Sequence, residues 1–505
     1  MFTERNRLKM QLKIKILKWS AGLPVVMLNE KTAKKIGIFT KDRIFMKTSS
    51  NKTISSIVDI SSGLVKENEI AVSSEMKDAL ELKVGQKVEV THAPISKSLI
   101  YIKKKLDKKE LSLEEVRTII DGIVSNSLSE AEIALFVSAM YRNGTSMNET
   151  ISLVKAIAES GKKIVWKKGI VVDKHSIGGI PGNRTTPLVV SILAAAGLLI
   201  PKTSSRAITT AAGTSDVVET IADVEFSIPE IKKIVSKTNG CMVWGGSLGI
   251  VPADSKIIKI EKVLEIDPEA QLLASIMAKK LSMGAKYILI DIPYGKTAKV
   301  TREHGLKLKK KFEYLGKYFK RKLKVVLTNG EQPIGNGIGP ALELMDIVKI
   351  LSRDKSENNI KYPYDLEKKS VFLAGELLEM TGMAKKGKGK QLALIIMDSG
   401  KAFEKFKEII KAQRGSVNRL RYGKFKKIIS SSRSGTIAEI HNKKINSLTR
   451  ATGSPLNKFS GVYLHHHVGE KVKKGEPLVT LYSDIPSKLR EAVSFYNEHK
   501  PITIK

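Results

Sequence analysis

The chain has 505 residues, 42% of them hydrophobic and 27% charged, and this length exceeds what a single core supports, so we expect several domains. A single cysteine, Cys241, excludes an internal disulfide framework and a cysteine-based zinc site, and it is typical of a cytoplasmic protein. No apolar run approaches the roughly 18 residues of a membrane span, and the first residues lack the apolar core of a secretory signal.

The formal net charge is +36, which raises the question of a nucleic-acid partner. The lysines are spread over the whole chain, and the densest run, residues 307–327, predicts an amphipathic helix with a solvated cationic face followed by a strand. No zinc-finger or RNA-recognition signature accompanies that run. We therefore expect no nucleic-acid partner and no membrane partner, and keep a basic binding module as the non-enzymatic alternative.

Residues 1–92 alternate short apolar runs with turns, which predicts a small β-rich, barrel-like domain. From residue 93 to 168 the hydrophobic period becomes helical, and three capping boxes follow one another. In each, a serine precedes a glutamate by three residues: Ser112 with Glu115, Ser129 with Glu132, and Ser146 with Glu149. The pattern predicts a helical domain, which we expect residues 255–285 or so to complete.

Residues 169–420 alternate strand, glycine-rich turn and helix, which predicts an α/β domain with a mostly parallel sheet. Thr186 followed by Pro187 predicts a helix N-cap and first turn, and Gly197 predicts the end of that helix. Residues 421–505 are β-rich and end in a helix, so we expect an α+β domain there. The fold class is thus multidomain α/β, with the helical and α/β domains forming a cleft.

The turn "DKHSIGGIPGNRTT" lies between a predicted strand and a predicted helix. Its glycines allow backbone N–H groups to converge on an anion at the positive end of the helix dipole. Lys174, Ser176 and Thr185 add a cation and two hydroxyl donors. A glycine-rich turn alone is common and can be purely structural, so a second loop is needed to support a phosphate site.

That second loop is "KTSSRAITTAAGT", residues 202–214, which again follows a predicted strand. Donor-rich loops at the carboxyl ends of strands in one sheet face the same crevice. Its hydroxyls can instead be structural loop formers. The chain lacks "GxxxxGK[ST]" and "GxGxxG" motifs, and no aspartate cluster indicates a metal site, so we expect neither metal nor cofactor.

Three collinear motifs, "DKHSIGG", "SSRAITTAAGTSD" and "ASIMAKKL", resemble the pyrimidine-nucleoside phosphorylase family, which includes thymidine phosphorylase. The β-rich N-terminal extension, "GGIPGNRTT" and "KTSSRAIT" are similar to its archaeal AMP phosphorylase subgroup. The resemblance covers essentially the whole chain. It implies that AMP and inorganic phosphate are substrates, giving adenine and ribose 1,5-bisphosphate, with possible extension to CMP and UMP, and that the protein is a homo-oligomer, a dimer or larger.

The resemblance also implies the site. Phosphate would be held by Lys174, Ser176, Thr185, Ser204 and Thr214. The nucleotide would be bound by Gly179, Ser205, Arg206, Ala207, Ile208, Thr209, Thr210, Thr214, Ser275, Lys279 and Lys299. Asp267 would donate a proton to the leaving base. Arg206 and Lys299 are the cations that we expect at the 5′-phosphate of the substrate.

Several of these residues have alternative interpretations. Asp267 precedes Pro268 and can be a helix N-cap, and His175 can be the general acid or a hydrogen-bonding residue beside the loop. Lys279 can be solvated or paired, and Lys299 can be an ordinary loop cation. His465, His466 and His467 have no matching ligand set in the sequence, so we expect a surface position.

One difference from the pyrimidine enzymes concerns the base. They carry an arginine before the Ser-x-x-x-Lys pair for the base carbonyl, but the corresponding stretch here, "KIIKIEKVLEID", contains none. A pyrimidine-nucleoside phosphorylase is therefore the enzymatic alternative rather than the leading function.

Overall fold

The computed structural model describes residues 9–21, 24–93, 96–207, 210–356 and 361–505. These residues form two compact units. The first unit comprises residues up to 160 together with 252–271, and the second comprises 161–251 together with 272–505. In the described residues, no helix has the length and apolar character needed to cross a membrane.

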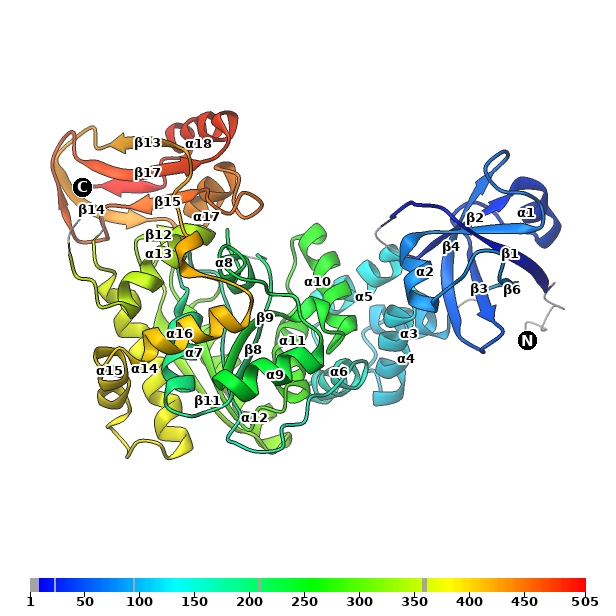
Figure 1. Cartoon of the computed structure of the whole chain (residues 1–505), viewed down its shortest axis with the longest axis horizontal. Coiled ribbons are helices and arrows are strands. Elements are labelled where there is room, and N and C mark those ends of the chain that lie inside the picture. The colour runs from blue at the N-terminus through cyan, green and yellow to red at the C-terminus, as the bar shows by residue number, and fades with distance from the viewer. Residues whose placement is uncertain (1–8, 22–23, 94–95, 208–209, 357–360) are drawn as a thin grey trace. The chain divides into compact units, whose positions relative to one another are not determined.

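The N-terminal part of the first unit is a closed six-stranded barrel with strand order β1-β5-β2-β4-β3-β6 (Figure 1, blue). All six strands lie where the alternating apolar runs predict them. Alternate residues such as Leu12, Ile14, Ile44 and Met46 point into a dry core. The elements are β1 (Met10–Ile16), β2 (Val25–Asn29), α1 (Glu30–Ile36), β3 (Arg43–Thr48), β4 (Thr53–Ser61), β5 (Glu69–Val72), α2 (Ser74–Leu80) and β6 (Lys87–His92).

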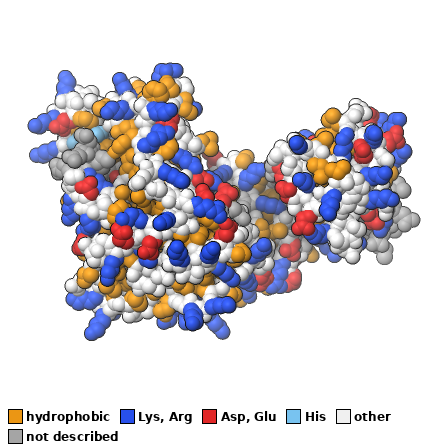
Figure 2. Space-filling view, viewed as in Figure 1, with side chains coloured by type: hydrophobic (Ala, Val, Ile, Leu, Met, Phe, Trp, Pro, Cys, Tyr) orange, Lys and Arg blue, Asp and Glu red, His pale blue; other side chains and the backbone are white. Residues whose placement is uncertain are grey.

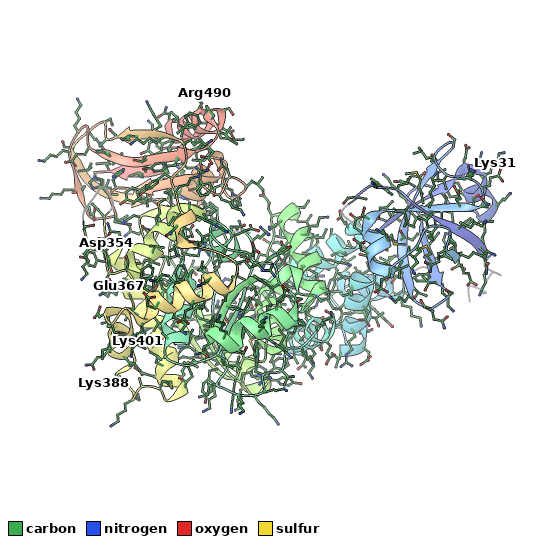
Figure 3. All side chains as sticks on the ribbon, viewed as in Figure 1. Lys31, Asp354, Glu367, Lys388, Lys401 and Arg490 are labelled. Atoms are coloured by element: carbon green, nitrogen blue, oxygen red, sulfur yellow. The ribbon has the colours of Figure 1, made fainter. Side chains whose placement is uncertain are left out.

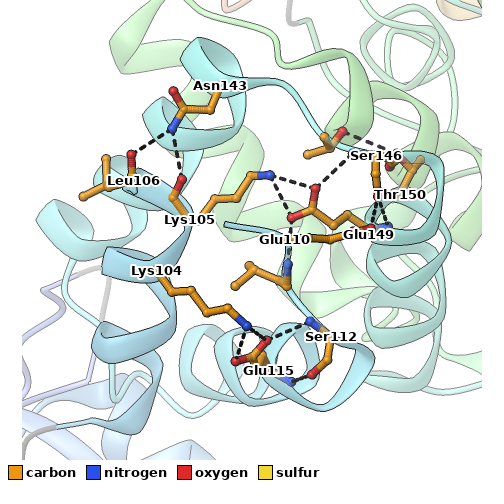
Figure 4. Close-up of polar contacts among 12 residues, drawn as sticks. Lys104, Lys105, Leu106, Glu110, Ser112, Glu115, Asn143, Ser146, Glu149 and Thr150 are labelled. Carbon is orange, nitrogen blue, oxygen red and sulfur yellow. Dashed lines mark hydrogen bonds and ion pairs between the residues drawn. The ribbon is translucent and has the colours of Figure 1, made fainter. Parts of the chain in front are cut away.

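Helices form the rest of the first unit: α3 (Lys97–Leu106), α4 (Leu113–Val124), α5 (Glu130–Asn143), α6 (Met147–Glu159) and α10 (Pro252–Leu264). The three predicted capping boxes are confirmed at the starts of α4, α5 and α6. Glu149 of the third box also accepts from the buried Lys105 at 2.7 Å, a contact drawn in Figure 4. It accepts as well from the backbone N–H of Leu111 at 3.0 Å. The cap residue thus ties α3 and α6 together.

The second unit contains two groups of parallel strands, which confirms the predicted α/β character. β7 (Val172–Ser176), β10 (Tyr287–Tyr294) and β11 (Lys322–Asn329) pair in the order β11-β10-β7, and β8 (Ile200–Ser204) pairs with β9 (Gly240–Trp244). A parallel bridge from Val171 to Leu199 joins the starts of β7 and β8. The two strands that precede the predicted loops are therefore neighbours.

Helices and short turns surround these strands (Figure 1, green to yellow). They are α7 (Thr185–Ala195), α8 (Thr214–Val218), α9 (Ile228–Thr238), η1 (Gly245–Ser247), α11 (Glu269–Ser282), α12 (Arg302–Tyr318), α13 (Pro340–Leu351), α14 (Tyr364–Thr381), α15 (Gly389–Asp398), α16 (Lys401–Ala412) and η2 (Val417–Arg419). The predicted cationic helix is α12. The predicted Thr186 cap is wrong, because α7 begins at Thr185 with Arg184 in the cap position.

The C-terminal residues form small antiparallel sheets with two helices (Figure 1, orange to red). The elements are β13 (Phe425–Ser430), β14 (Gly435–Ile440), α17 (Asn442–Ala451), β15 (Gly461–Leu464), β16 (Lys471–Val472), β17 (Pro477–Ser483), α18 (Pro486–His499) and β18 (Ile502–Ile504). β12 (Gly337–Ile338), which precedes α13, pairs with β15. The C-terminal sheet is thus bonded to the α/β part of its own unit.

The cationic side chains are distributed over many elements. On the face drawn in Figure 2, lysines and arginines lie among acidic and apolar side chains. Figure 3 shows Lys31, Lys388, Lys401 and Arg490 on well-separated segments of the chain. Many lysines pair with nearby carboxylates, as Lys34 does with Glu30. This distribution is consistent with the predicted solvated surface.

Candidate active site

The two predicted loops lie together in the second unit. The first follows β7 and the second follows β8, and these parallel strands start from bridged residues. The guanidinium of Arg184 in the first loop donates from Nη1 to Thr214 Oγ1 in the second at 3.1 Å. Donors from both loops therefore gather at one edge of the sheet, as the sequence predicts.

Lys174 is buried at the end of β7 and donates from Nζ to Thr185 Oγ1 at 2.5 Å. Thr185 is the first residue of α7, so the lysine charge and the positive end of the helix dipole coincide. Burial lowers the pKa of Lys174 to about 7, although Asp291 opposes that shift. A bound anion would stabilise the charged form of this buried lysine at the start of the helix.

More buried ions lie beneath the loop. Lys280 of α11 and Lys202 of β8 both pair with Asp173, at 2.8 Å and 3.4 Å. Lys369 of α14 pairs with Asp291 at 3.1 Å. We call Lys174, Lys202, Lys280 and Lys369 the lysine cluster. Burial also lowers the pKa of Lys280 to about 7, against the attraction of Asp173.

The backbone geometry of the first loop explains why glycines occur there. Gly178 and Gly179 have φ of +86° and +92°, the left-handed region that favours glycine. A Cβ on Gly179 would lie 2.8 Å from Cβ of Lys299, so these two predicted nucleotide residues are in contact. Ser176 Oγ accepts from the Asn183 amide at 3.3 Å, which fixes the turn.

His175 is half-buried next to Lys174. Burial, followed by repulsion from Lys280, Lys202 and Lys279, holds its pKa well below the usual value. A neutral imidazole is a poor acid at neutral pH.

The second loop is closed by Asp216 of α8. One carboxylate oxygen accepts from the backbone N–H of Ala207 at 2.7 Å and of Gly213 at 2.6 Å, on the two sides of the loop. Ser204 Oγ lies 2.8 Å from Ser215 Oγ, and Ser205 is exposed. The predicted nucleotide residues Ile208 and Thr209 lie outside the described residues.

The C-terminal region also holds this loop, which the sequence did not indicate. The side chain of Asn446 on α17 accepts from Ala211 N at 3.1 Å, and Ser454 Oγ donates to Ala211 O at 3.2 Å. Arg450 donates to the carbonyl of Thr210 at 3.3 Å. These contacts span more than 230 residues of sequence, so no local pattern could reveal them.

Arg206 has carboxylate partners already. Its guanidinium pairs with Glu219 at 2.5 Å and Glu225 at 2.9 Å and lies 4.8 Å above the Trp244 ring. A hollow of about 370 Å³ adjoins these groups and is lined by Glu219, Ala222, Asp223, Val224, Glu225, Arg419 and Lys458. Three carboxylates in that lining make it unsuited to a phosphate.

Ser275 and Lys279 lie one turn apart on α11, and Lys279 Nζ donates to Ser275 Oγ at 2.9 Å. The predicted shared helix face is thus confirmed. Asp267 lies between α10 and α11, in the first unit, and is exposed. The three histidines, expected at the surface, are each partly exposed. His465 also contacts Thr480, and His467 contacts Asn336.

The residue that sequence reasoning missed most clearly is Arg184. It is buried, donates to Thr214 and to the Ala212 carbonyl, and pairs through Nε with Glu343 Oε2 at 2.6 Å. Its partner lies 159 residues away, on α13. The only local signal was a charged residue inside a glycine-rich turn.

Three family descriptions match the chain. Residues 100–161 match the helical bundle domain of a glycosyl transferase family, and residues 168–403 match the a/b domain of such a family. Residues 436–503 match the pyrimidine nucleoside phosphorylase C-terminal domain.

Similar curated proteins extend over nearly the whole chain. An AMP phosphorylase of Methanococcus vannielii is 41% identical over 498 residues, covering 98% of this chain and 97% of that protein. One of Thermococcus kodakarensis is 42% identical over 501 residues, covering 98% of each. The crystal structure of anthranilate phosphoribosyltransferase from Thermus thermophilus has a TM-score of 0.51 at 16% identity, covering 62% of this chain and 99% of that one, which is a likeness of fold alone.

Proposed function

Because the chain belongs to the AMP phosphorylase family, we propose that it converts AMP and inorganic phosphate to adenine and ribose 1,5-bisphosphate. A phosphate oxygen forms a bond to C1′ of the ribose, the bond from C1′ to the base breaks, and a proton goes to the departing adenine. The observation that carries this proposal is the 41% identity to an AMP phosphorylase over 98% of the chain.

The loop geometry supports the phosphate half of the reaction. Lys174 supplies a buried cation, and Thr185 and Thr214 are the first residues of α7 and α8. Ser176 and Ser204 follow at the ends of β7 and β8. An anion held by such donors stabilises the positive charge that develops on the sugar as the glycosidic bond breaks.

Two contacts support the proposed nucleotide site. Lys299 lies against Gly179, and Lys279 donates to Ser275 on α11. Arg206 is a weaker candidate for the 5′-phosphate than its charge indicates, because Glu219 and Glu225 already balance it. Lys299, whose Cβ and backbone lie against the glycine turn at Gly179, is the cation that we assign to the 5′-phosphate. Charge-assisted hydrogen bonds to that phosphate would favour a nucleotide over a nucleoside.

We propose Asp267 as the general acid because the family resemblance implies that role. Its carboxyl is exposed, so the bound base would have to cover it to keep a proton there at neutral pH. A neutral imidazole at His175 has no readily released proton at neutral pH. Asp267→Asn should abolish turnover while AMP still binds, whereas His175→Asn should retain a measurable rate. A fully active Asp267→Asn together with an inactive His175→Asn would return the acid role to His175.

The experiment that tests the function is release of free adenine from AMP, followed with and without inorganic phosphate. We expect phosphate-dependent release from AMP and a far slower rate with adenosine. Equal rates on the two would reject the nucleotide substrate, and faster release of uracil from uridine would favour a pyrimidine-nucleoside phosphorylase. Absence of any phosphate-dependent release would reject a phosphorylase.

The breadth of substrates and the oligomeric state are also proposals. CMP and UMP are proposed as additional substrates, tested in the same assay by release of cytosine and uracil. The protein is proposed to be a homo-oligomer, tested by sedimentation velocity of the full chain. A monomer across the micromolar range would reject that proposal.

A further inference from the structure

Arg184 occupies a position from which it reaches the second loop, although it belongs to the first. It lies in the cap position of α7, one residue before Thr185, and its side chain is 11% exposed. Nη1 donates to Thr214 Oγ1 at 3.1 Å and Nη2 donates to the Ala212 carbonyl at 2.6 Å. One guanidinium therefore contacts both the side chain of Thr214 and the backbone two residues before it.

Glu343 fixes the direction of that guanidinium. The Glu343 carboxylate is 1% exposed and accepts from Arg184 Nε at 2.6 Å, while its second oxygen accepts from Gly339 N at 3.2 Å. Glu343 lies in the first turn of α13, so this helix holds the Arg184–Glu343 ion pair in place. Burial raises the pKa of Glu343, and the charge of Arg184 opposes that shift.

The contact with Thr214 has a chemical consequence. A guanidinium can donate hydrogen bonds but cannot accept them. When Thr214 Oγ1 accepts from Arg184, its own hydrogen points elsewhere and remains available to donate. The same logic applies to Thr185, whose oxygen accepts from the Lys174 ammonium at 2.5 Å.

We propose that Arg184, held by Glu343, is a positioning residue that fixes the Thr214 hydroxyl as a hydrogen-bond donor to the attacking phosphate. The proposal rests on the proposed function for the identity of that anion. Arg184 acts through Thr214. Lys174 orients Thr185 in the same way, in addition to supplying its own charge, so two helix-starting threonines become donors at one site. A free hydroxyl would have to be reoriented each time phosphate binds, and this arrangement removes that need.

The test measures affinity for inorganic phosphate by calorimetric titration, which requires no turnover. Thr214→Val should weaken phosphate binding about tenfold or more, because it loses a hydrogen bond to a charged group. Thr214→Ser should stay within about threefold, because it keeps the hydroxyl. Adenine release is measured in parallel, so a failure of AMP phosphorolysis is recognised separately from a failure of the positioning role.

Arg184 is then replaced together with its partner, since Arg184→Met alone leaves Glu343 buried and unpaired. The Arg184→Met/Glu343→Gln protein should fold with a melting temperature near that of the wild type and bind phosphate about tenfold more weakly. In a Thr214→Val background, the same two substitutions should change phosphate affinity less than about threefold, because their effect passes through that hydroxyl.

Arg353 provides a matched control. It follows the other end of α13 and pairs with Glu367, labelled in Figure 3, and with Asp398 at 2.7 Å. Arg353→Met should lower thermal stability and leave phosphate affinity unchanged.

Three results would overturn the proposal. They are wild-type phosphate affinity in Arg184→Met/Glu343→Gln, unchanged affinity in Thr214→Val, and fully additive losses when the two sets of substitutions are combined. Each can be observed whether or not AMP is the substrate.

Discussion

Lys174 and Arg206 are both cations in donor-rich loops, yet the structure gives them opposite surroundings. Lys174 is buried and donates to a threonine hydroxyl, and burial lowers its pKa to about 7. Arg206 is partly exposed, and hydrogen bonds to Glu219 raise its pKa despite burial. A cation whose charge is not balanced at contact distance favours an incoming anion, whereas a balanced one mainly stabilises its loop.

The largest effect expected from this comparison is that of Lys174→Met. Removing one partner of a buried charged contact costs enough to weaken phosphate affinity about 30-fold or more. Turnover should fall as well, with phosphate affinity measured by calorimetry and rate by adenine release. Lys307→Met, at a lysine whose side chain is 68% exposed, is the control and should change neither quantity. Unchanged phosphate dependence in Lys174→Met would remove Lys174 from the site.

The second prediction concerns pH. Because Lys174 and Lys280 have pKa values of about 7, each loses its charge as pH rises through that value. Only the charged lysine attracts an anion, so affinity for phosphate should fall between about pH 6 and pH 9, by up to roughly tenfold per pH unit for one group. The fall of phosphate affinity with pH should be shallower in Lys174→Met, which has one titrating lysine fewer. A steeper fall in that variant than in the wild type would contradict the assignment.

The third prediction contrasts the two cations proposed for the 5′-phosphate. Lys299→Met should raise the KM for AMP about tenfold, since a charge-assisted hydrogen bond is lost. Arg206→Met should raise it less than about threefold and lower the free energy of unfolding by about 1 kcal/mol, as expected for a partly exposed ion pair. Steady-state kinetics and chemical denaturation measure the two effects. A larger effect of Arg206→Met on the KM for AMP would contradict the assignment of Lys299 to the 5′-phosphate.

The smallest expected effect comes from a substitution outside both loops. Ser129→Ala removes the serine half of the capping box at α5 and should lower the free energy of unfolding by about 1 kcal/mol. Phosphate affinity and the KM for AMP should stay at wild-type values. A changed phosphate affinity or KM in Ser129→Ala would show that a loss of stability by itself alters these quantities. The effects of the loop variants could then not be assigned to the site.

Local patterns account for the parts that could be predicted. The serine and glutamate of each capping box act within one turn, so spacing alone is sufficient to identify the starts of α4, α5 and α6. The barrel strands follow from alternation of apolar residues, and the glycines of the first loop follow from the backbone conformation that the turn requires. Proximity of the two loops follows from parallel strands that are neighbours.

What could not be predicted depends on residues far apart in sequence. The carboxylates that balance Arg206 lie 13 and 19 residues away, and Glu343 lies 159 residues from Arg184. Propensity favoured Thr186 as a cap, but Arg184 is the cap residue of α7, two residues before the predicted one. Ile208 and Thr209 remain predictions, as does the role of Asp267.

The lysine cluster would also couple phosphate binding at the proposed site to the stability of the folded protein. In this cluster four buried lysines accompany two buried aspartates, Asp173 and Asp291, so the surroundings of the first loop hold more cationic than anionic side chains. A ligand that binds only the folded chain raises its unfolding free energy by an amount that grows with the logarithm of ligand concentration. Phosphate bound at the proposed site would therefore raise the melting temperature of the protein even when no AMP is present.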